Sequence, residues 1–145
     1  MAEPSLGMRM TMIARIFRTR FDRRAREIGL TRAQWSTISC VKGKPGATQH
    51  MIATLLEVGD VTAGRSIDRL EEAGWVERRP DPQDRRVYRI YATDAAAPVL
   101  ARLTALGDDE ENIAFAGFSD AELEQLKAMM GRIMDNLSET DCAAA

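Results

Sequence analysis

Residues 52–91 read IATLLEVGDVTAGRSIDRLEEAGWVERRPDPQDRRVYRIY, and this stretch decides the fold. It begins inside an apolar helix that is predicted to end near Leu56. The break Glu57-Val58-Gly59 follows, and a second helix begins after it. Either Asp60 or Thr62 can cap this second helix, because each carries a side-chain oxygen that accepts from the free amides of a first turn. The order of elements predicts a helix-turn-helix.

The second helix has two different faces. Its apolar residues recur at three- and four-residue spacing, which predicts one buried face formed by Ala63, Ile67 and Leu70. The opposite face carries polar and cationic groups, namely Thr62, Arg65, Ser66 and Arg69. Gly74 is typical of the residue that ends a helix. We therefore expect a helix that packs on one side and presents hydrogen-bonding groups on the other.

Two extended segments follow this helix. Trp75–Arg79 and Val87–Tyr91 are rich in aromatic and β-branched residues, which favour strands. Between them, Pro80–Arg86 is too long and too rich in proline for a two-residue turn, so we expect a projecting, arginine-bearing loop. A polar helix followed by a cationic hairpin suits a protein that places the helix in the major groove of DNA. The predicted fold is mainly α with a small antiparallel β wing, a winged helix-turn-helix.

The hairpin also carries a family pattern. The run LEEAGWVERRPDPQDRRVYRIYAT, from Leu70 to Thr93, resembles the wing signature of the MarR family of transcription regulators. The residues that match are Leu70, Glu71, Gly74, Val76, Arg78, Asp84, Arg86 and Thr93. Upstream, GLTRAQW, Gly29–Trp35, resembles the SlyA-like branch of that family. The resemblance extends from about residue 6 to about residue 137.

The second helix offers the groups that base edges require. Arg65 has a planar fork that can bond guanine bidentately, and Thr62 and Ser66 can donate or accept. Arg69 lies nearer the end of the helix and is expected to contact phosphate. Gly64 departs from the usual pattern of such a helix, because an interior glycine costs about 1 kcal/mol relative to alanine. Close approach to DNA and an unoptimised position both explain it.

The resemblance implies how the loop is used. Relatives brace the loop with an aspartate–arginine pair while an arginine at its tip enters the minor groove. Asp84 and Arg86 match this pair, and the Asp84 carboxylate can hold the Arg86 guanidinium by a paired hydrogen bond. Arg85 and Arg86 both match the inserted arginine, and the sequence does not distinguish them. Gln49, at the start of the preceding helix, is a further candidate for phosphate contact.

Charge is distributed unevenly along the 145 residues, although the net charge is only −2. Residues 1–59 hold 10 Lys/Arg against 4 Asp/Glu, residues 60–91 hold 7 of each, and residues 92–145 hold 3 against 11. A protein that holds nucleic acid by bulk charge alone is basic overall. This one must instead place its cationic groups locally.

Several classes of protein are disfavoured. No phosphate-cradling glycine loop, nucleophile–base pair or His/Cys cluster is present, so we expect neither an enzyme nor a cofactor nor a metal site. No apolar run approaches the roughly 20 residues of a membrane span and the N-terminus has no signal-peptide pattern, so a cytoplasmic protein with no membrane partner is expected. Cys40 and Cys142 are too few for a disulfide framework.

The two ends of the chain carry long amphipathic helices. Apolar residues recur at three- and four-residue steps from Leu6 to Ile28, and a heptad-like seam runs from Leu123 to Leu137 behind the capping box Ser119–Glu122. A second long helix is expected to begin at Thr93. A lone winged domain does not need three such helices, so we expect a two-fold homodimer. The predicted organisation of 1–145 is one domain, with a DNA-binding part at about 31–92 and dimerisation helices at about 6–28 and 94–138.

A small-molecule effector is a further expectation from the resemblance. Family members bind small aromatic acids or other lipophilic compounds between the dimerising helices and the winged part. The residues that could line such a cleft are Ile13, Ile16, Phe17, Trp35 and Ile38, with an arginine of the first helix as counter-charge. Ordinary core packing explains the same residues. Cys40 lies among apolar residues with no activating partner, which favours an inert thiol over a redox sensor.

Three possible functions differ in how the protein is expected to bind duplex DNA. A sequence-specific regulator binds one palindromic operator in double-stranded DNA, and we expect this regulator to be a repressor. An architectural protein binds duplexes weakly without preference and with strong salt dependence. A winged module for protein–protein contact binds no duplex at all.

Overall fold

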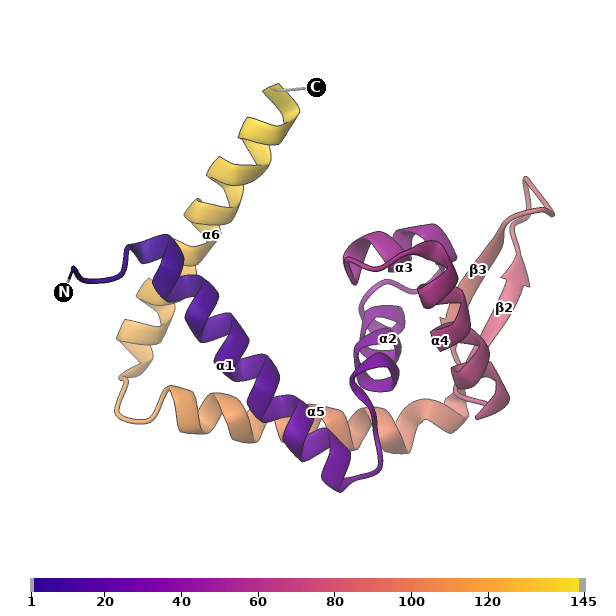
Figure 1. The fold of residues 1–145 in the computed structure, drawn as a ribbon, viewed down its shortest axis with the longest axis horizontal. Helices are drawn as coiled ribbons and strands as arrows, with labels where there is room; N and C mark the ends of the chain where they lie inside the picture. The colour runs from indigo at the N-terminus through magenta and orange to yellow at the C-terminus, as the bar shows by residue number, and fades with distance from the viewer. Residues whose placement is uncertain (1, 144–145) are drawn as a thin grey trace. The chain divides into compact units, whose positions relative to one another are not determined.

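The computed structural model describes residues 2–143, with side chains described for residues 2–138. It is mostly helical with one small antiparallel sheet, which confirms the predicted fold class. The elements in chain order are α1 Leu6–Glu27, α2 Arg32–Gly43, β1 Ala47–Thr48, α3 Gln49–Leu55, α4 Asp60–Glu72, β2 Val76–Pro80, β3 Tyr88–Ala92, the 3-10 helix η1 Asp94–Ala96, α5 Ala97–Ala114 and α6 Asp120–Ala143 (Figure 1). The chain forms two compact units, divided after Glu110.

Local side-chain bonds fix where most helices begin. A capping box, legible in the sequence Thr31-Arg32-Ala33-Gln34, opens α2: the Thr31 hydroxyl accepts from the Gln34 N–H and the Gln34 side chain accepts from the Thr31 N–H. Thr48 caps α3 by accepting from the Met51 N–H at 3.2 Å. In the second unit, Ser119 and Glu122 form the predicted capping box of α6. These bonds satisfy amides that a helix start leaves free.

Two glycines end helices, one of them the predicted Gly74. Gly29, after α1, and Gly74, after α4, have φ angles of +83° and +78°, a region that L side chains rarely adopt. After Gly74 the chain turns back, so that the Trp75 N–H donates to the Leu70 carbonyl. This bond satisfies one of the last carbonyls of α4 and directs the chain into β2.

The predicted cap of α4 is wrong. The residue that caps α4 is Gly59, which has no side chain, whereas Asp60 and Thr62 already lie inside the first turn. The Asp60 carboxylate lies 3.0 Å from His50 Nδ1 on α3 instead. The helix expected to begin at Thr93 begins there through a 3-10 turn: Thr93 is the N-cap of η1, which runs directly into α5, and its hydroxyl donates to the Gly74 carbonyl.

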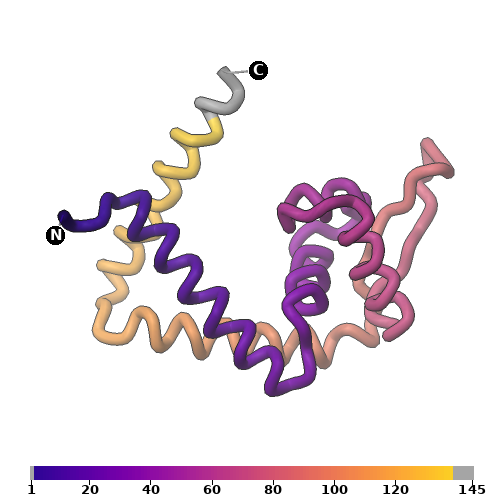
Figure 2. The backbone as a smooth tube through the Cα atoms, in the orientation of Figure 1, coloured from indigo at the N-terminus to yellow at the C-terminus, as the bar shows by residue number. Residues whose placement is uncertain are grey.

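The sheet has the order β1-β3-β2, and both pairs are antiparallel. Its hairpin strands begin and end one residue later than predicted, and β2 and β3 pair with Arg78 opposite Ile90. The two-residue strand β1 was not predicted, because two residues carry no periodicity. Figure 2 shows the hairpin as a narrow loop that extends beyond α4.

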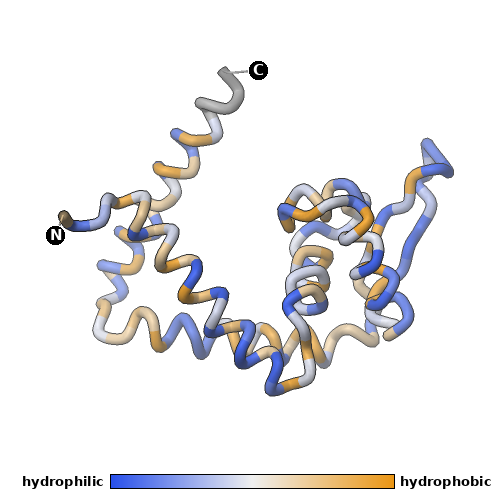
Figure 3. Tube along the Cα trace, viewed as in Figure 1, coloured by the Kyte–Doolittle hydropathy of each residue, from blue (hydrophilic) through white to orange (hydrophobic). Residues whose placement is uncertain are grey.

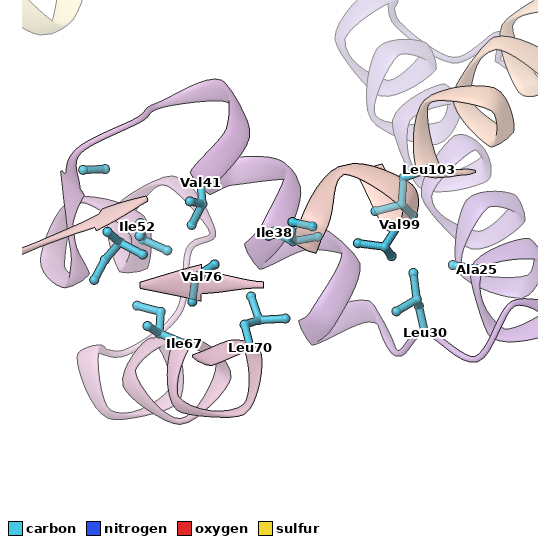
Figure 4. Close-up of a cluster of buried hydrophobic side chains, with 13 residues drawn as sticks. Ala25, Leu30, Ile38, Val41, Ile52, Ile67, Leu70, Val76, Val99 and Leu103 are labelled. Atoms are coloured by element: carbon cyan, nitrogen blue, oxygen red, sulfur yellow. The ribbon is translucent and has the colours of Figure 1, made fainter. Parts of the chain in front are cut away.

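The core lies where α2, α3 and α4 meet the sheet, and it continues towards α1 and α5 through Ala25, Leu30, Val99 and Leu103 (Figure 4). Its largest fully buried side chains include Ile38, Ile52, Ile67, Leu70 and Ile90. Burying one such aliphatic side chain contributes about 1.5–3 kcal/mol. The predicted inward face of α4 is therefore confirmed, and the same packing fixes the orientation of its outward face.

An acid cluster joins α1 to α5 within the first unit. Glu110 is only 3% exposed, and its carboxylate accepts from Arg20 Nε at 2.5 Å and from an Arg24 nitrogen at 3.2 Å. Arg24 also contacts Asp109 at 2.8 Å. The helix α5 continues through the acidic run at residues 108–111, where α1 supplies the counter-charges.

The second unit consists of the end of α5, a turn and α6. In the turn, the rings of Phe115 and Phe118 meet edge to face, with centroids 6.0 Å apart. Much of the apolar seam of α6 is exposed in the single chain, including Met130, Ile133 and Leu137. No helix among the described residues is long and apolar enough to cross a membrane.

Candidate nucleic-acid interface

The outward face of α4 is exposed and cationic. Because Ala63, Ile67 and Leu70 are buried, Arg65 and Arg69 point away from the core and are exposed. Thr62 is exposed and Ser66 is half-buried, and both line a groove towards α2. The structure thus separates the four predicted residues of this helix into an outward arginine pair and a hydroxyl pair at its edge.

Two of the acidic residues of α4 are neutralised from the sheet. Arg78 of β2 contacts the Asp68 carboxylate at 2.6 Å and the Glu71 carboxylate at 3.0 Å. In addition, Arg79 lies over the Tyr91 ring, 4.3 Å from its centroid. Arg78 therefore holds β2 against α4 and reduces the negative charge that a polyanion would meet there.

A hydrogen bond joins α3 to the start of α4 across the turn of the helix-turn-helix. Gln49 is half-buried, and its amide nitrogen donates to the Asp60 carbonyl at 3.0 Å. Gly64 makes room for this side chain, since a Cβ at that position would lie 2.7 Å from Gln49 Nε2. Gly64 therefore faces α3 and not the exposed face, which removes close approach to DNA as the reason for the glycine.

We expect Gly64→Ala to leave the free energy of unfolding nearly unchanged. Alanine gains about 1 kcal/mol of helix propensity, but it displaces Gln49 and loses a hydrogen bond of about 0.5–1.5 kcal/mol. In a Gln49→Ala background the gain should stand alone and stabilise the protein by about 1 kcal/mol. Urea denaturation of the four proteins of this double-mutant cycle measures it. Equal effects of Gly64→Ala in both backgrounds would contradict the coupling.

The base of the wing is held by an aspartate that sequence reasoning missed. Asp81 accepts from the Gln83 N–H at 2.8 Å, the Asp84 N–H at 3.2 Å and Arg89 Nε at 2.5 Å. Arg89 also donates to the Gly46 carbonyl at 2.9 Å, which ties β3 to the start of β1. The Gln83 amide and the Arg89 guanidinium hold the pKa of the Asp81 carboxyl below its usual range, so it is ionised at neutral pH.

The predicted brace between Asp84 and the Arg86 guanidinium is not the one observed. Asp84 accepts instead from the Arg86 backbone N–H at 3.0 Å. The guanidinium groups of Arg85 and Arg86 are exposed, and neither pairs with another side chain among residues 2–138. Figure 3 shows the loop between β2 and β3 as predominantly hydrophilic. The wing thus presents two free cationic groups on a loop that Asp81 holds from inside.

We expect Asp81→Ala to weaken binding to duplex DNA by loosening this loop. The change removes an acceptor from two backbone amides and one guanidinium, so the wing arginines lose their fixed position. Asp84→Ala, which removes a single backbone contact, is the matched control and should have the smaller effect. Fluorescence anisotropy with a labelled duplex measures both. A larger loss for Asp84→Ala would contradict the assignment of the brace.

The structure does not gather the five predicted effector residues into one site. Ile38 is fully buried core, Ile13 and Ile16 are exposed on α1, and Phe17 is half-buried. Only Trp35 lines the open groove between α2 and the α3–α4 turn, a space of about 990 Å³. The groove also contains Arg18, Arg32 and Ser39, together with Thr62 and Ser66 of α4. Of the five residues expected to line an effector cleft, the groove therefore contains Trp35 alone.

Cys40 lies at the wall of this groove and is half-buried. Burial raises the pKa of its thiol above the ordinary value, although Lys44 nearby partly opposes the shift. The thiolate that oxidants attack is therefore disfavoured at neutral pH. The side chain of Cys142 lies outside the described residues.

The fold and the site together define a class. A buried helix pair that presents an arginine-bearing helix, beside a hairpin with two free arginines, is the architecture of a winged helix-turn-helix protein. The family model described as MarR family matches residues 28–87. The chain belongs to the MarR family, whose members are transcriptional regulators.

Individual relatives of this chain are of the same class. The chain is 32% identical to the transcriptional regulator SlyA in its crystal structure, covering 94% of this chain and 96% of that one, with a TM-score of 0.77. It is 28% identical over 126 residues to the HTH-type transcriptional regulator YybA of Bacillus subtilis, covering 87% of this chain and 84% of that protein. A putative MarR family regulator from Listeria monocytogenes, complexed with 26mer DNA, shares the fold at 17% identity, with a TM-score of 0.79 and coverage of 95% and 92%.

Proposed function

We propose that this regulator binds, as a homodimer, a palindromic operator in double-stranded DNA and represses transcription by occupying it. The observation that carries the proposal is the set of arginines on α4 and on the wing, Arg65, Arg69, Arg85 and Arg86. Their guanidinium groups are exposed and pair with no other side chain in the described part of the chain. Unpaired guanidinium groups on a helix and a neighbouring loop suit base edges and phosphates.

Each predicted residue has a role in this proposal. Arg65 bonds a guanine in the major groove, and Thr62 and Ser66 contact the edge of the same groove. Arg69 contacts phosphate, as does Gln49 through its remaining amide donor. Arg85 or Arg86 enters the minor groove, where a narrow A·T-rich segment attracts a cation most strongly. Asp84 shapes the wing tip through its bond to the Arg86 N–H. The complex of the Listeria protein, which shares this fold, with 26mer DNA supports DNA binding as the function.

The dimer is supported by the apolar residues that the single chain leaves exposed. On α1 these include Leu6, 80% exposed, with Ile13 and Ile16, and on α6 they include Ile133 and Leu137. Contiguous apolar surfaces of this kind mark protein interfaces. We assign the dimer to residues 6–28 and 94–138, and DNA binding to residues 31–92. The two-fold symmetry would place half-sites about 34–36 Å apart.

Selection of bound sequences from random duplex DNA tests the proposal, together with light scattering at micromolar concentration. We expect a recovered palindrome and the mass of a dimer. Weak binding without sequence preference would indicate an architectural protein, and its affinity would fall steeply with salt. A stable complex with another protein and no duplex binding would indicate a protein-contact module. A clean monomer mass would contradict the two-fold arrangement.

Release by an aromatic or lipophilic effector completes the proposal, and the groove at Trp35 favours it. Arg18 lines this groove and pairs with no other described side chain, so it can serve as the counter-charge of an acid. An occupant would contact Thr62 and Ser66 of α4 and so bias the helix that faces DNA. A thermal-shift screen with benzoate-type carboxylates should raise the melting temperature of the wild type but not of Arg18→Ala. Arg15→Ala, on the same helix but away from the groove, is the control.

A further inference from the structure

Val61 is an exposed apolar residue on the outward face of α4. Its exposed fraction, 68%, is the largest of any large apolar side chain between residues 30 and 92. It occupies the second position of the helix, where a β-branched residue has lower helix propensity than alanine, glutamate or lysine. Neither burial nor helix stability therefore explains a valine there.

The helix places Val61 beside Arg65. Residues four apart are neighbours on one face of a helix, and the buried residues Ala63, Ile67 and Leu70 define the opposite face. Thr62 and Ser66, in contrast, line the groove towards α2, which Val61 and Arg65 do not. The central pair on the exposed face of the first two turns is thus one apolar and one cationic side chain.

Asp60, the acidic residue next to Val61, is bonded to α3. The Asp60 carboxylate lies 3.0 Å from His50 Nδ1 on α3, and its backbone carbonyl accepts from Gln49. Both contacts draw Asp60 towards α3, although its side chain stays 59% exposed, and Val61 is the first apolar side chain of the exposed face. The N-terminal residues of such a helix are the ones that reach base edges.

We propose that Val61 contacts the 5-methyl group of a thymine that lies within two base pairs of the guanine bonded by Arg65. This inference rests on the proposed function and specifies the sequence it recognises. Among the four bases only thymine presents an apolar group in the major groove. Four residues span about 6 Å of helix axis, and successive base pairs are about 3.4 Å apart, which gives the stated separation. The two branches of the valine side chain are held in few rotamers, so the methyl contact costs little entropy.

Replacement of single thymines by uracil tests the contact, because it removes only the methyl group. In the operator recovered by selection, we expect one thymine per half-site at which uracil lowers the affinity about fourfold, and about 10- to 20-fold when both half-sites are changed. The Val61→Ala variant should bind thymine and uracil at that position equally. Val58→Ala, an exposed valine that lines the groove instead, should respond to uracil as the wild type does.

The outcomes separate this contact from the proposed function. An operator whose affinity is unchanged by uracil at every thymine overturns the contact by Val61 and leaves sequence-specific regulation intact. A Val61→Ala variant that keeps the full response to uracil also overturns it. A selection that recovers no preferred sequence overturns both proposals together.

Discussion

Arg65→Ala should lower the affinity for the selected operator by about 5- to 150-fold per half-site, since a bidentate contact to guanine is worth about 1–3 kcal/mol. Arg65 is exposed on the outward face of α4, and no side chain in the described part of the chain competes for its guanidinium. The loss should be confined to the operator, while affinity for an unrelated duplex falls little. Fluorescence anisotropy at one fixed salt concentration measures both.

Two other arginines make this result interpretable. Arg69→Ala should weaken operator and unrelated duplex alike and reduce the slope of log affinity against log salt by about one, the behaviour of a phosphate contact. Arg102→Ala, an exposed arginine of α5 outside the DNA-binding part at residues 31–92, should change neither the affinity nor the salt slope. If Arg65→Ala instead weakens all duplexes equally, then Arg65 contacts phosphate and the base readout lies elsewhere on α4.

Local signals in the sequence predicted the helix-turn-helix and its wing well. The capping box at Thr31 and the glycine at position 74 act within a few residues of chain, so their chemistry is legible without the fold. The buried face of α4 followed from its period, because a helix of 3.6 residues per turn repeats apolar positions on one side. These three expectations depend only on residues close together in the chain, and the structure confirms them.

Contacts between distant residues were not predictable in the same way. Asp81 and Asp84 both stand in the wing loop, and only the fold shows that Arg89 and the Gly46 carbonyl meet beside Asp81. The reason for Gly64 likewise lies on another helix, in the Gln49 side chain. Asp60 illustrates a prediction that local chemistry allowed but the fold did not follow. Its carboxylate could have capped α4, but it contacts His50 of α3 instead. Such choices depend on which groups the packing brings together.

The cluster at Glu110 has the same long-range origin, and it gives the second large expected effect. Arg20→Ala should destabilise the fold by about 1–2 kcal/mol, because it leaves a carboxylate that is 3% exposed without its closest partner. The figure stays at the low end, since Arg20 is itself 37% exposed and solvent screens the pair. Arg23→Ala, an exposed arginine of the same helix, is the control. Urea denaturation monitored by circular dichroism measures the free energy of unfolding.

The pH dependence identifies the cause of this loss. The Arg20 hydrogen bond, and secondarily Arg24, holds the pKa of Glu110 below its ordinary value of 4.5, although burial opposes the shift. A carboxyl whose pKa is lower in the folded state stabilises the protein above its unfolded pKa, and this contribution disappears as pH falls through the folded pKa. The difference between wild type and Arg20→Ala should therefore be full at pH 7 and shrink below about pH 4.5. A difference that stays constant down to pH 3 would show that Arg20 stabilises the α1–α5 contact through packing of its aliphatic stem and not through its charge.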